Sequence, residues 1–228
     1  MARANGLHHL AISTGDIKTQ IEFFSDVLGM ELVALYWMHG VAGTFHGFMR
    51  LNDGASVALV QNDKIKQTRA IAGVSHAGNP GAPSAPGTMQ HVAFNVDSEA
   101  DLLALRDRIR SRGVVVFGPL DHGLCKSIYF AGPEGLSLEI ATSEAAIDPE
   151  AWIDPEVQAL VGINMEELSR FKRPAAYQGE GGRLKQPAYD SSKPHQVYPP
   201  EAYKALMAMT DAEFFKLSEP NPPVKVPA

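Results

Sequence analysis

The stretch DHGLCKSIYFAGPEGLSLEIATS, residues 121–143, determines how the rest of the chain is interpreted. Apolar residues alternate there with smaller or polar ones, at Ile128, Phe130, Leu136, Leu138 and Ile140, and a Gly-Pro-Glu-Gly tetrapeptide separates the two runs. A period of two on either side of a Pro/Gly turn is typical of a half-buried β-hairpin. The stretch therefore predicts two strands, over residues 127–131 and 136–141.

One residue of this hairpin does not fit a purely structural role. Glu139 stands between Leu138 and Ile140, so its carboxylate is expected to be partly buried. A buried charge without a partner is costly, which predicts a positively charged group or a metal ion nearby. A surface position or a structural ion pair is the alternative interpretation for an isolated glutamate.

Upstream of the hairpin, residues 88–145 follow the pattern of one βαβββ unit. A strand over 90–96 is followed by Ser98 as helix N-cap, a helix up to Gly113 and strands over 114–117, 127–131 and 136–141. Residues 5–65 show the same order. A strand over 7–13 precedes an Asp16 cap, a helix that ends at Gly29, and strands over 30–37, 44–51 and 55–61, the last two joined by an Asn-Asp-Gly turn.

The two units are visibly copies of each other. HLAISTGD, residues 9–16, aligns with HVAFNVDS, residues 91–98, and a Gly/Pro/Ser/Ala-rich connector over 73–87 separates the copies. A βαβββ unit cannot cover both faces of its own sheet, so the copies are expected to pack side by side. The predicted fold is α+β: two modules forming a cupped mixed sheet around a metal, in a domain over 1–145.

The last segment, residues 146–228, is not a third copy. It holds 11 of the 16 prolines and is expected to be a C-terminal extension with short helices near 166–171 and 201–209. Its many aromatic residues favour packing on the domain or on a partner subunit in a homo-oligomer over a solvated tail.

Composition excludes several classes of protein. A formal charge of -6 and the lack of a basic tract argue against nucleic acid or an anionic membrane as a partner. The chain shows neither a signal peptide nor an apolar run of membrane-spanning length, and its single Cys125 cannot form an internal disulfide. These features predict a cytoplasmic protein.

The repeat also suggests a metal site. His9 and His91 occupy matching positions at the start of the first strand of each copy, and Glu139 lies on the last strand of the second. Two imidazoles and one carboxylate on adjacent strands form a facial triad, which suits non-haem Fe(II) and leaves positions open for substrate and oxygen.

These residues resemble those of the vicinal oxygen chelate superfamily, which includes glyoxalase I, resistance proteins, epimerases and extradiol ring-cleaving dioxygenases. The resemblance covers about residues 5–145 and rests on LHHLAI with FFSDVLGMEL, on MQHVAF and on SIYFAGPEGLSLEIAT. It implies His9 (rather than His8), His91 and Glu139 as metal ligands. Fe(II) is the expected ion, with Mn(II), Zn(II) and Ni(II) as alternatives.

Two features favour the dioxygenase branch of that family. The last strand of the first copy, ASVALVQ, offers no further carboxylate ligand unless Gln61 reaches the site. Tyr129 precedes Glu139 by ten residues, the spacing of a tyrosine that contacts substrate in extradiol enzymes. The resemblance further implies a histidine acid or base near the metal, with His122 as first candidate and His8 and His76 as rivals.

The sequence thus predicts an enzyme, a non-haem Fe(II) extradiol-type dioxygenase that cleaves a catechol- or hydroquinone-like ring with O2. Its catalytic residues would be Tyr129 and His122. The leading alternative is a glyoxalase- or epimerase-like isomerase or lyase that acts through an enediolate. A drug-binding resistance protein is a third possibility, against which the retained His9, His91 and Glu139 argue.

Overall fold

The structure is a computed structural model that describes residues 3–225. Its first module consists of β1 (His9–Ser13), α1 (Ile17–Glu22), the π-helical turn η1 (Phe23–Val27), β2 (Glu31–Trp37), β3 (Phe45–Asn52) and β4 (Ala55–Gln61). The second consists of β5 (Val92–Asn95), α3 (Glu99–Ser111), β6 (Val116–Asp121), β7 (Lys126–Ala131), the 3₁₀ turn η2 (Pro133–Gly135) and β8 (Ser137–Thr142). A short helix, α2 (Asp63–Gln67), which the sequence analysis did not predict, leads into the connector.

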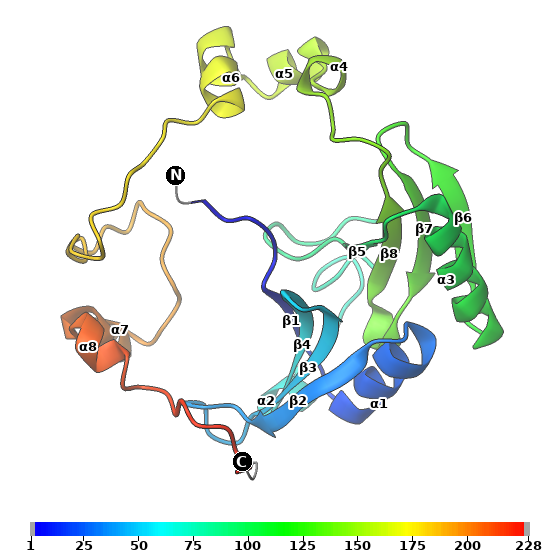
Figure 1. The fold of residues 1–228 in the computed structure, drawn as a ribbon. Helices are drawn as coiled ribbons and strands as arrows, with labels where there is room; N and C mark the ends of the chain where they lie inside the picture. The colour runs from blue at the N-terminus through cyan, green and yellow to red at the C-terminus, as the bar shows by residue number, and fades with distance from the viewer. Residues whose placement is uncertain (1–2, 226–228) are drawn as a thin grey trace.

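Each module forms one four-stranded mixed sheet (Figure 1). The strand orders are β1-β4-β3-β2 and β5-β8-β7-β6; the first pair in each sheet is parallel and the others are antiparallel. The predicted α+β fold of two βαβββ modules is confirmed. Within residues 3–225 the two sheets are not hydrogen-bonded to each other, so the cup is built from two sheets rather than from one continuous sheet.

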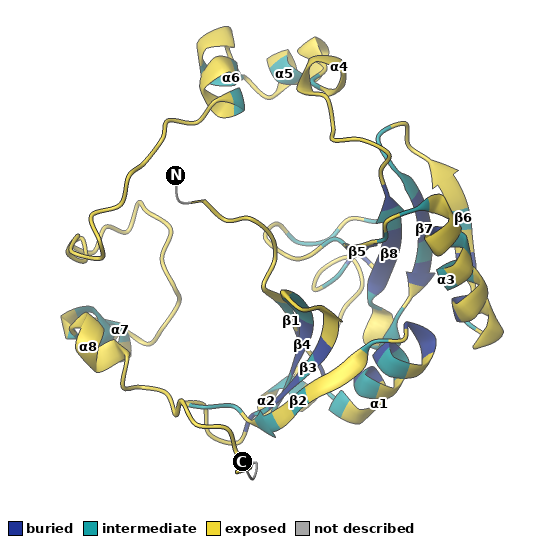
Figure 2. Cartoon of the chain, viewed as in Figure 1, coloured by how far each residue is buried: buried dark blue, intermediate teal, exposed yellow. Residues whose placement is uncertain are grey.

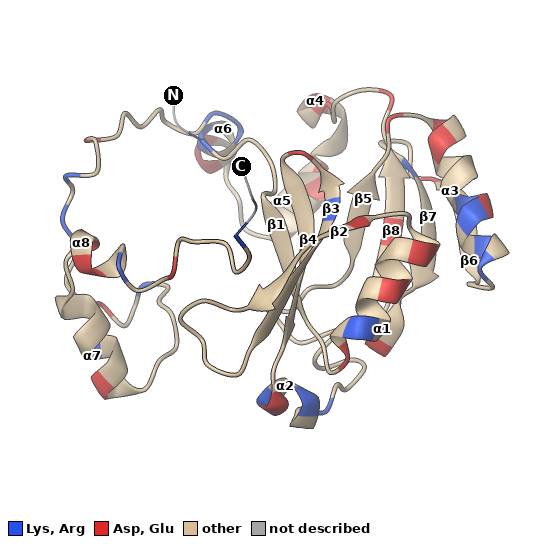
Figure 3. Cartoon of the chain, turned by 60° about the horizontal axis from the view of Figure 1, so that its bottom comes forward, with Lys and Arg blue, Asp and Glu red and all other residues tan. Residues whose placement is uncertain are grey.

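The helical segment of each module begins and ends close to where the sequence predicts. Asp16 accepts hydrogen bonds from the backbone of Lys18 and Thr19 at the start of α1, and Ser98 accepts one from Asp101 N at the start of α3. In α3 the first turn is acidic and the last turn basic, which complements the helix dipole and gives the mixed colours of this helix in Figure 3. Gly113, with φ 78°, then ends the second helical segment.

A single apolar core joins the modules. Alternate residues of β3, β4, β7 and β8 enter this core, among them Met49, Leu59, Ile128, Leu138 and Ile140. Phe24 after α1 and Phe94 on β5 meet edge to face, with ring centroids 6.4 Å apart, so the contact crosses the module boundary. The opposite surface of each sheet, which we call the inner face, is left free for a site.

Two polar contacts reinforce this joint. Arg108 of α3 donates hydrogen bonds to the carbonyl oxygens of residues 25–27, at 3.1–3.3 Å. Near the start of the same helical segment, the carboxylate of Glu134, in the turn between β7 and β8, accepts from Gly15 N at 2.7 Å and from Gln20 Nε2 at 2.9 Å. The second module therefore contacts the helical segment of the first module near both of its ends.

We expect Arg108→Ala to lower the free energy of unfolding by about 1–2 kcal/mol, because three backbone carbonyls lose a charged donor. Urea unfolding followed by circular dichroism measures this. Arg112→Ala, an exposed arginine just beyond the same helix, is the control and should change stability by less than about 0.5 kcal/mol. Equal effects in the two variants would contradict a specific role for Arg108 in the joint.

Over its described residues, 146–225, the extension contains five short helices: α4 (Pro149–Trp152), α5 (Pro155–Leu160), α6 (Met165–Lys172), α7 (Pro200–Ala208) and α8 (Asp211–Phe214). Those predicted near 166–171 and 201–209 are present as α6 and α7. The proline-rich composition concealed α4 and α5. Proline is favoured in the first turn of a helix, and α4, α5 and α7 all begin with one.

The extension runs as an arc past the open side of the cup and is almost wholly exposed (Figures 1 and 2). It touches the two-module domain near its two ends. The Trp152 ring lies against Gly123, where an added Cβ would come within 2.9 Å of it, and the carbonyl of Leu217 lies against Gly40. Large apolar side chains between these points, such as Phe171, are exposed, a composition that favours a partner surface.

We therefore expect truncation after residue 145 to reduce the oligomeric state or the solubility of the protein, because the exposed apolar side chains of the extension are suited to contact with a partner subunit. Light scattering and sedimentation velocity compare the two forms, with near-ultraviolet circular dichroism as the check on folding. Equal mass and melting temperature in the two forms would show that the extension makes no subunit contact.

Candidate functional site

The buried carboxylate of Glu139 is the centre of the candidate site. Its neighbours Leu138 and Ile140 enter the core, so strand alternation directs Glu139 to the inner face, where only 5% of the residue is exposed. In register with it lie Ala93 on β5 and Tyr129 on β7. The predicted burial of Glu139 is therefore present in the structure.

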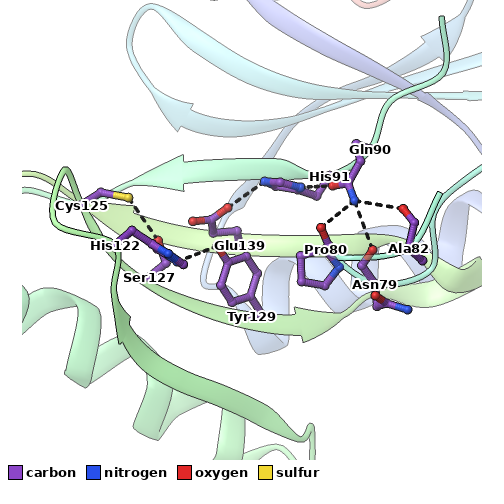
Figure 4. Close-up of polar contacts among 10 residues, drawn as sticks. All are labelled: Asn79, Pro80, Ala82, Gln90, His91, His122, Cys125, Ser127, Tyr129 and Glu139. Atoms are coloured by element: carbon purple, nitrogen blue, oxygen red, sulfur yellow. Dashed lines mark hydrogen bonds and ion pairs between the residues drawn. The ribbon is translucent and has the colours of Figure 1, made fainter. Parts of the chain in front are cut away.

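His91 is the close partner of this carboxylate. It comes immediately before β5, and its Nε2 lies 2.9 Å from Glu139 Oε2 (Figure 4). The two side chains therefore form a close nitrogen–oxygen pair on the inner face of the second module.

A phenol and a second imidazole flank the pair. The Tyr129 hydroxyl lies 3.1 Å from His122 Nε2, and His122 lies at the end of β6 (Figure 4). Burial and the Glu139 carboxylate both raise the pKa of Tyr129 above its ordinary value. The phenol thus keeps its proton at neutral pH and is available as a hydrogen-bond donor.

His9 lies apart from this group. Its Nδ1 is 2.9 Å from His8 Nδ1, and its ring meets that of Phe48 edge to face at 5.7 Å. Among residues 3–225, no three His, Cys, Asp or Glu side chains are grouped so that they could hold a metal ion. The structure thus brings together His91 and Glu139 of the predicted triad.

A groove lies between β1 and β5. It has a volume of about 1170 Å³ and is lined by Leu10 from β1 and by residues 92–97 around β5. Because no hydrogen bonds join β1 to β5, pseudo-symmetry places the two histidines at matching positions without placing them in contact.

Two inner-face residues of the first module, His46 and Tyr36, were not predicted from the sequence. His46 on β3 is buried, and its Nδ1 lies 3.2 Å from the hydroxyl of Tyr36 on β2. Burial, with a smaller effect from His9, lowers the pKa of His46, so its imidazole is neutral at neutral pH. The signal was available, because the alternation in FHGF places His46 and Phe48 on one face.

The strand registers also show how the modules differ. Aligning His9 with His91 matches Ala58 to Glu139 and Phe48 to Tyr129, and each pair is in register across its sheet. The first module thus has an apolar pair where the second has a carboxylate and a phenol.

The other candidates have structural partners. Gln61 Oε1 accepts from Ile17 N at 2.6 Å, so it caps α1 instead of reaching the inner face. His76 shares a hydrogen bond with Ser75 and lies against Gly135, where a Cβ would meet its Nε2 at 2.5 Å. Of the three candidate acid/base histidines, His122 is the one that contacts Tyr129.

The chemistry of the close pair fits a divalent metal. A carboxylate oxygen and an imidazole nitrogen that face each other are donors suited to a first-row ion such as Fe(II), and a phenol lies alongside. His91 and Glu139 therefore fit the metal that the sequence predicts.

Comparison with known proteins agrees with the fold. The model of the Glyoxalase/Bleomycin resistance protein/Dioxygenase superfamily matches residues 6–140. The chain belongs to this superfamily. Its members bind a divalent metal.

No helix among residues 3–225 is long and apolar enough to cross a membrane.

Individual relatives are distant. A biphenyl-2,3-diol 1,2-dioxygenase of Rhodococcus globerulus is 28% identical over 99 residues, which are 43% of this chain and about half (52%) of that relative. A probable lactoylglutathione lyase of Synechocystis sp. is 24% identical over 150 residues, 62% of this chain and 98% of that relative. A crystal structure of a glyoxylase/bleomycin resistance protein/dioxygenase domain from Frankia sp. EAN1pec is 15% identical, with a TM-score of 0.49 over 62% of this chain and all of that domain.

We expect His91→Ala to lower bound Fe(II) from about one ion per chain to a small fraction of that, because the imidazole donor is lost while the fold remains. Anaerobic iron loading followed by elemental analysis measures this. Tyr129→Phe is the control, since it leaves both donors in place and should keep its iron. Full iron in His91→Ala would remove His91 from the ligand set.

Proposed function

We propose that this protein is a non-haem Fe(II) dioxygenase of the extradiol type, which cleaves a catechol- or hydroquinone-like ring with O2. The observation that supports it best is the Tyr129–His122 pair beside the His91–Glu139 pair on one inner face. In such a reaction one ring carbon–carbon bond breaks and both atoms of O2 enter the product. No further reductant is therefore needed.

In this proposal His91 and Glu139 hold the metal, and His9 completes the triad from the first module. When bound, Fe(II) would coordinate the diol and O2 and allow electrons to pass from one to the other; Mn(II), Zn(II) and Ni(II) are the alternative ions. One carboxylate and neutral imidazoles leave a net positive charge at the ion, which favours a deprotonated diol as the remaining ligand.

The surrounding side chains position the substrate and move protons. The protonated Tyr129 hydroxyl donates a hydrogen bond toward the diol or its oxygenated product, and His122, 3.1 Å away, can accept or return that proton. His46 offers a neutral imidazole from the opposite module, and the Phe48 ring offers an apolar surface for a planar aromatic substrate. We further propose a cytoplasmic homo-oligomer, as expected from the sequence.

A glyoxalase- or epimerase-like isomerase or lyase is the alternative. The match to nearly the full length of the probable lactoylglutathione lyase favours it. Against it, Gln61 is engaged at the start of α1, so the last strand of the first module supplies no amide ligand from that position. Oxygen consumption separates the two functions, since an enediolate mechanism takes up no O2.

The test is oxygen uptake by the Fe(II)-loaded protein with a panel of substituted catechols and hydroquinones. We expect uptake in a one-to-one ratio with ring-cleaved product, and a turnover lower by about 10²- to 10⁴-fold in Tyr129→Phe, which keeps iron but lacks the donor. Isomerisation of a hemithioacetal without O2 uptake would favour the alternative. Unchanged kinetics in Tyr129→Phe would leave the tyrosine a packing role.

A further inference from the structure

The side chain of Gln90 joins the connector between the modules to His91. Its Nε2 lies 3.3 Å from the carbonyl oxygen of Asn79, 2.7 Å from that of Pro80 and 3.3 Å from that of Ala82 (Figure 4). Its Oε1 contacts His91 Nδ1. The amide therefore touches three connector carbonyls on one side and an inner-face imidazole on the other.

These contacts determine which way the amide points. Backbone carbonyls only accept hydrogen bonds, so the atom that faces three of them must be the NH₂ group. The oxygen of Gln90 therefore faces His91 Nδ1, and because that oxygen cannot donate, Nδ1 must carry the hydrogen. The other ring nitrogen, Nε2, faces the Glu139 carboxylate, and it is the nitrogen that a metal would bind in place of a hydrogen.

The connector sequence explains why three carbonyls converge on one point. The Asn79 side chain accepts from Gly81 N at 3.0 Å, and its carbonyl accepts from Ala82 N at 3.2 Å. This is a tight turn of the kind that Asn-Pro-Gly favours, and it gathers the backbone carbonyls around the amide of Gln90. A segment whose composition suggests a passive linker thus forms a defined acceptor site.

We propose that Gln90 is a positioning residue that holds His91 as the Nδ1–H tautomer, with Nε2 turned toward Glu139, and that the connector turn orients Gln90 for this task. The inference rests on the proposed metal-binding function of His91 but not on the reaction catalysed. A metal-binding histidine commonly donates its other N–H to an acceptor that fixes the ring, and here that acceptor is a side-chain amide.

Two substitutions at Gln90 separate its role as acceptor for His91 from its role as donor to the connector turn. Gln90→Leu has a comparable volume but removes both the acceptor for His91 and the donors for the turn. Gln90→Glu retains an acceptor oxygen for Nδ1–H and loses the NH₂ group. Gln67→Leu, an exposed glutamine at the end of α2, is the matched control.

The first readout is metal affinity, measured as the Kd for Zn(II) by competition with a chromogenic chelator. We expect Gln90→Leu to bind Zn(II) about 10- to 100-fold more weakly than the native protein, the range found for loss of such outer partners. Gln90→Glu should bind close to the native level, and amide exchange over residues 79–82 should be faster in both variants. Gln67→Leu should change neither quantity.

The second readout is the tautomer of His91, from long-range ¹⁵N–¹H spectra of the Zn(II)-loaded protein at about pH 8. We expect Nδ1–H in the native protein and in Gln90→Glu, and a mixture of tautomers in Gln90→Leu. A native His91 protonated on Nε2 alone would overturn the proposal, as would unchanged affinity and tautomer in Gln90→Leu. If Gln90→Leu fails to fold, the tautomer of the native protein and the tautomer and Zn(II) affinity of Gln90→Glu still test the proposal.

Neither measurement depends on turnover. A protein that shows the expected tautomer and affinities but takes up no O2 with any diol would refute the dioxygenase proposal and leave the role of Gln90 standing. Oxygen uptake together with unchanged Zn(II) affinity and tautomer in Gln90→Leu would support the dioxygenase proposal and refute the role of Gln90.

Discussion

The structure depends on a joint at which each module completes the other. Neither four-stranded sheet can cover its own helix-facing side, and Phe24 and Phe94 meet where the two partial cores merge. Because the strands of the two sheets are not hydrogen-bonded to one another, this core, with Arg108 and Glu134 at its ends, fixes the angle between the modules. The geometry of the inner faces follows from packing on the opposite side of the sheets.

A second constraint comes from placing a charge on a buried strand. A carboxylate that is 5% exposed is stable when its oxygens have partners, and at Glu139 one partner is His91. The same environment that makes the charge costly also strengthens its interaction with a bound cation. The neighbouring phenol responds to this environment, since burial and the carboxylate raise the pKa of Tyr129. Protein stability and metal binding are thus opposing demands on the same few atoms.

Much of the fold was predictable because it rests on local signals. Each of these signals spans only a few residues: the helix caps at Asp16 and Ser98, the alternation of the strands, and the duplicated HLAI and HVAF segments. The position of His9 relative to His91 was not predictable in this way, because it depends on the angle between two sheets. His46 was missed although alternation marks it, and α4 and α5 were missed because their prolines suggested extended chain. The role of Gln90 needed three carbonyls from a connector that composition alone describes as a linker.

Ala58 and Phe48 in the first module occupy the positions that Glu139 and Tyr129 occupy in the second. This difference has an evolutionary consequence. After duplication, the copy with the ionisable pair is bound by the charge balance of that pair, and few exchanges there are neutral. The copy with the apolar pair has no such restriction and is free to vary in size and shape at these positions. Relatives that share one chemistry but differ in the molecules they accept are therefore expected to diverge first along β3 and β4. A laboratory search for altered selectivity should begin on those two strands.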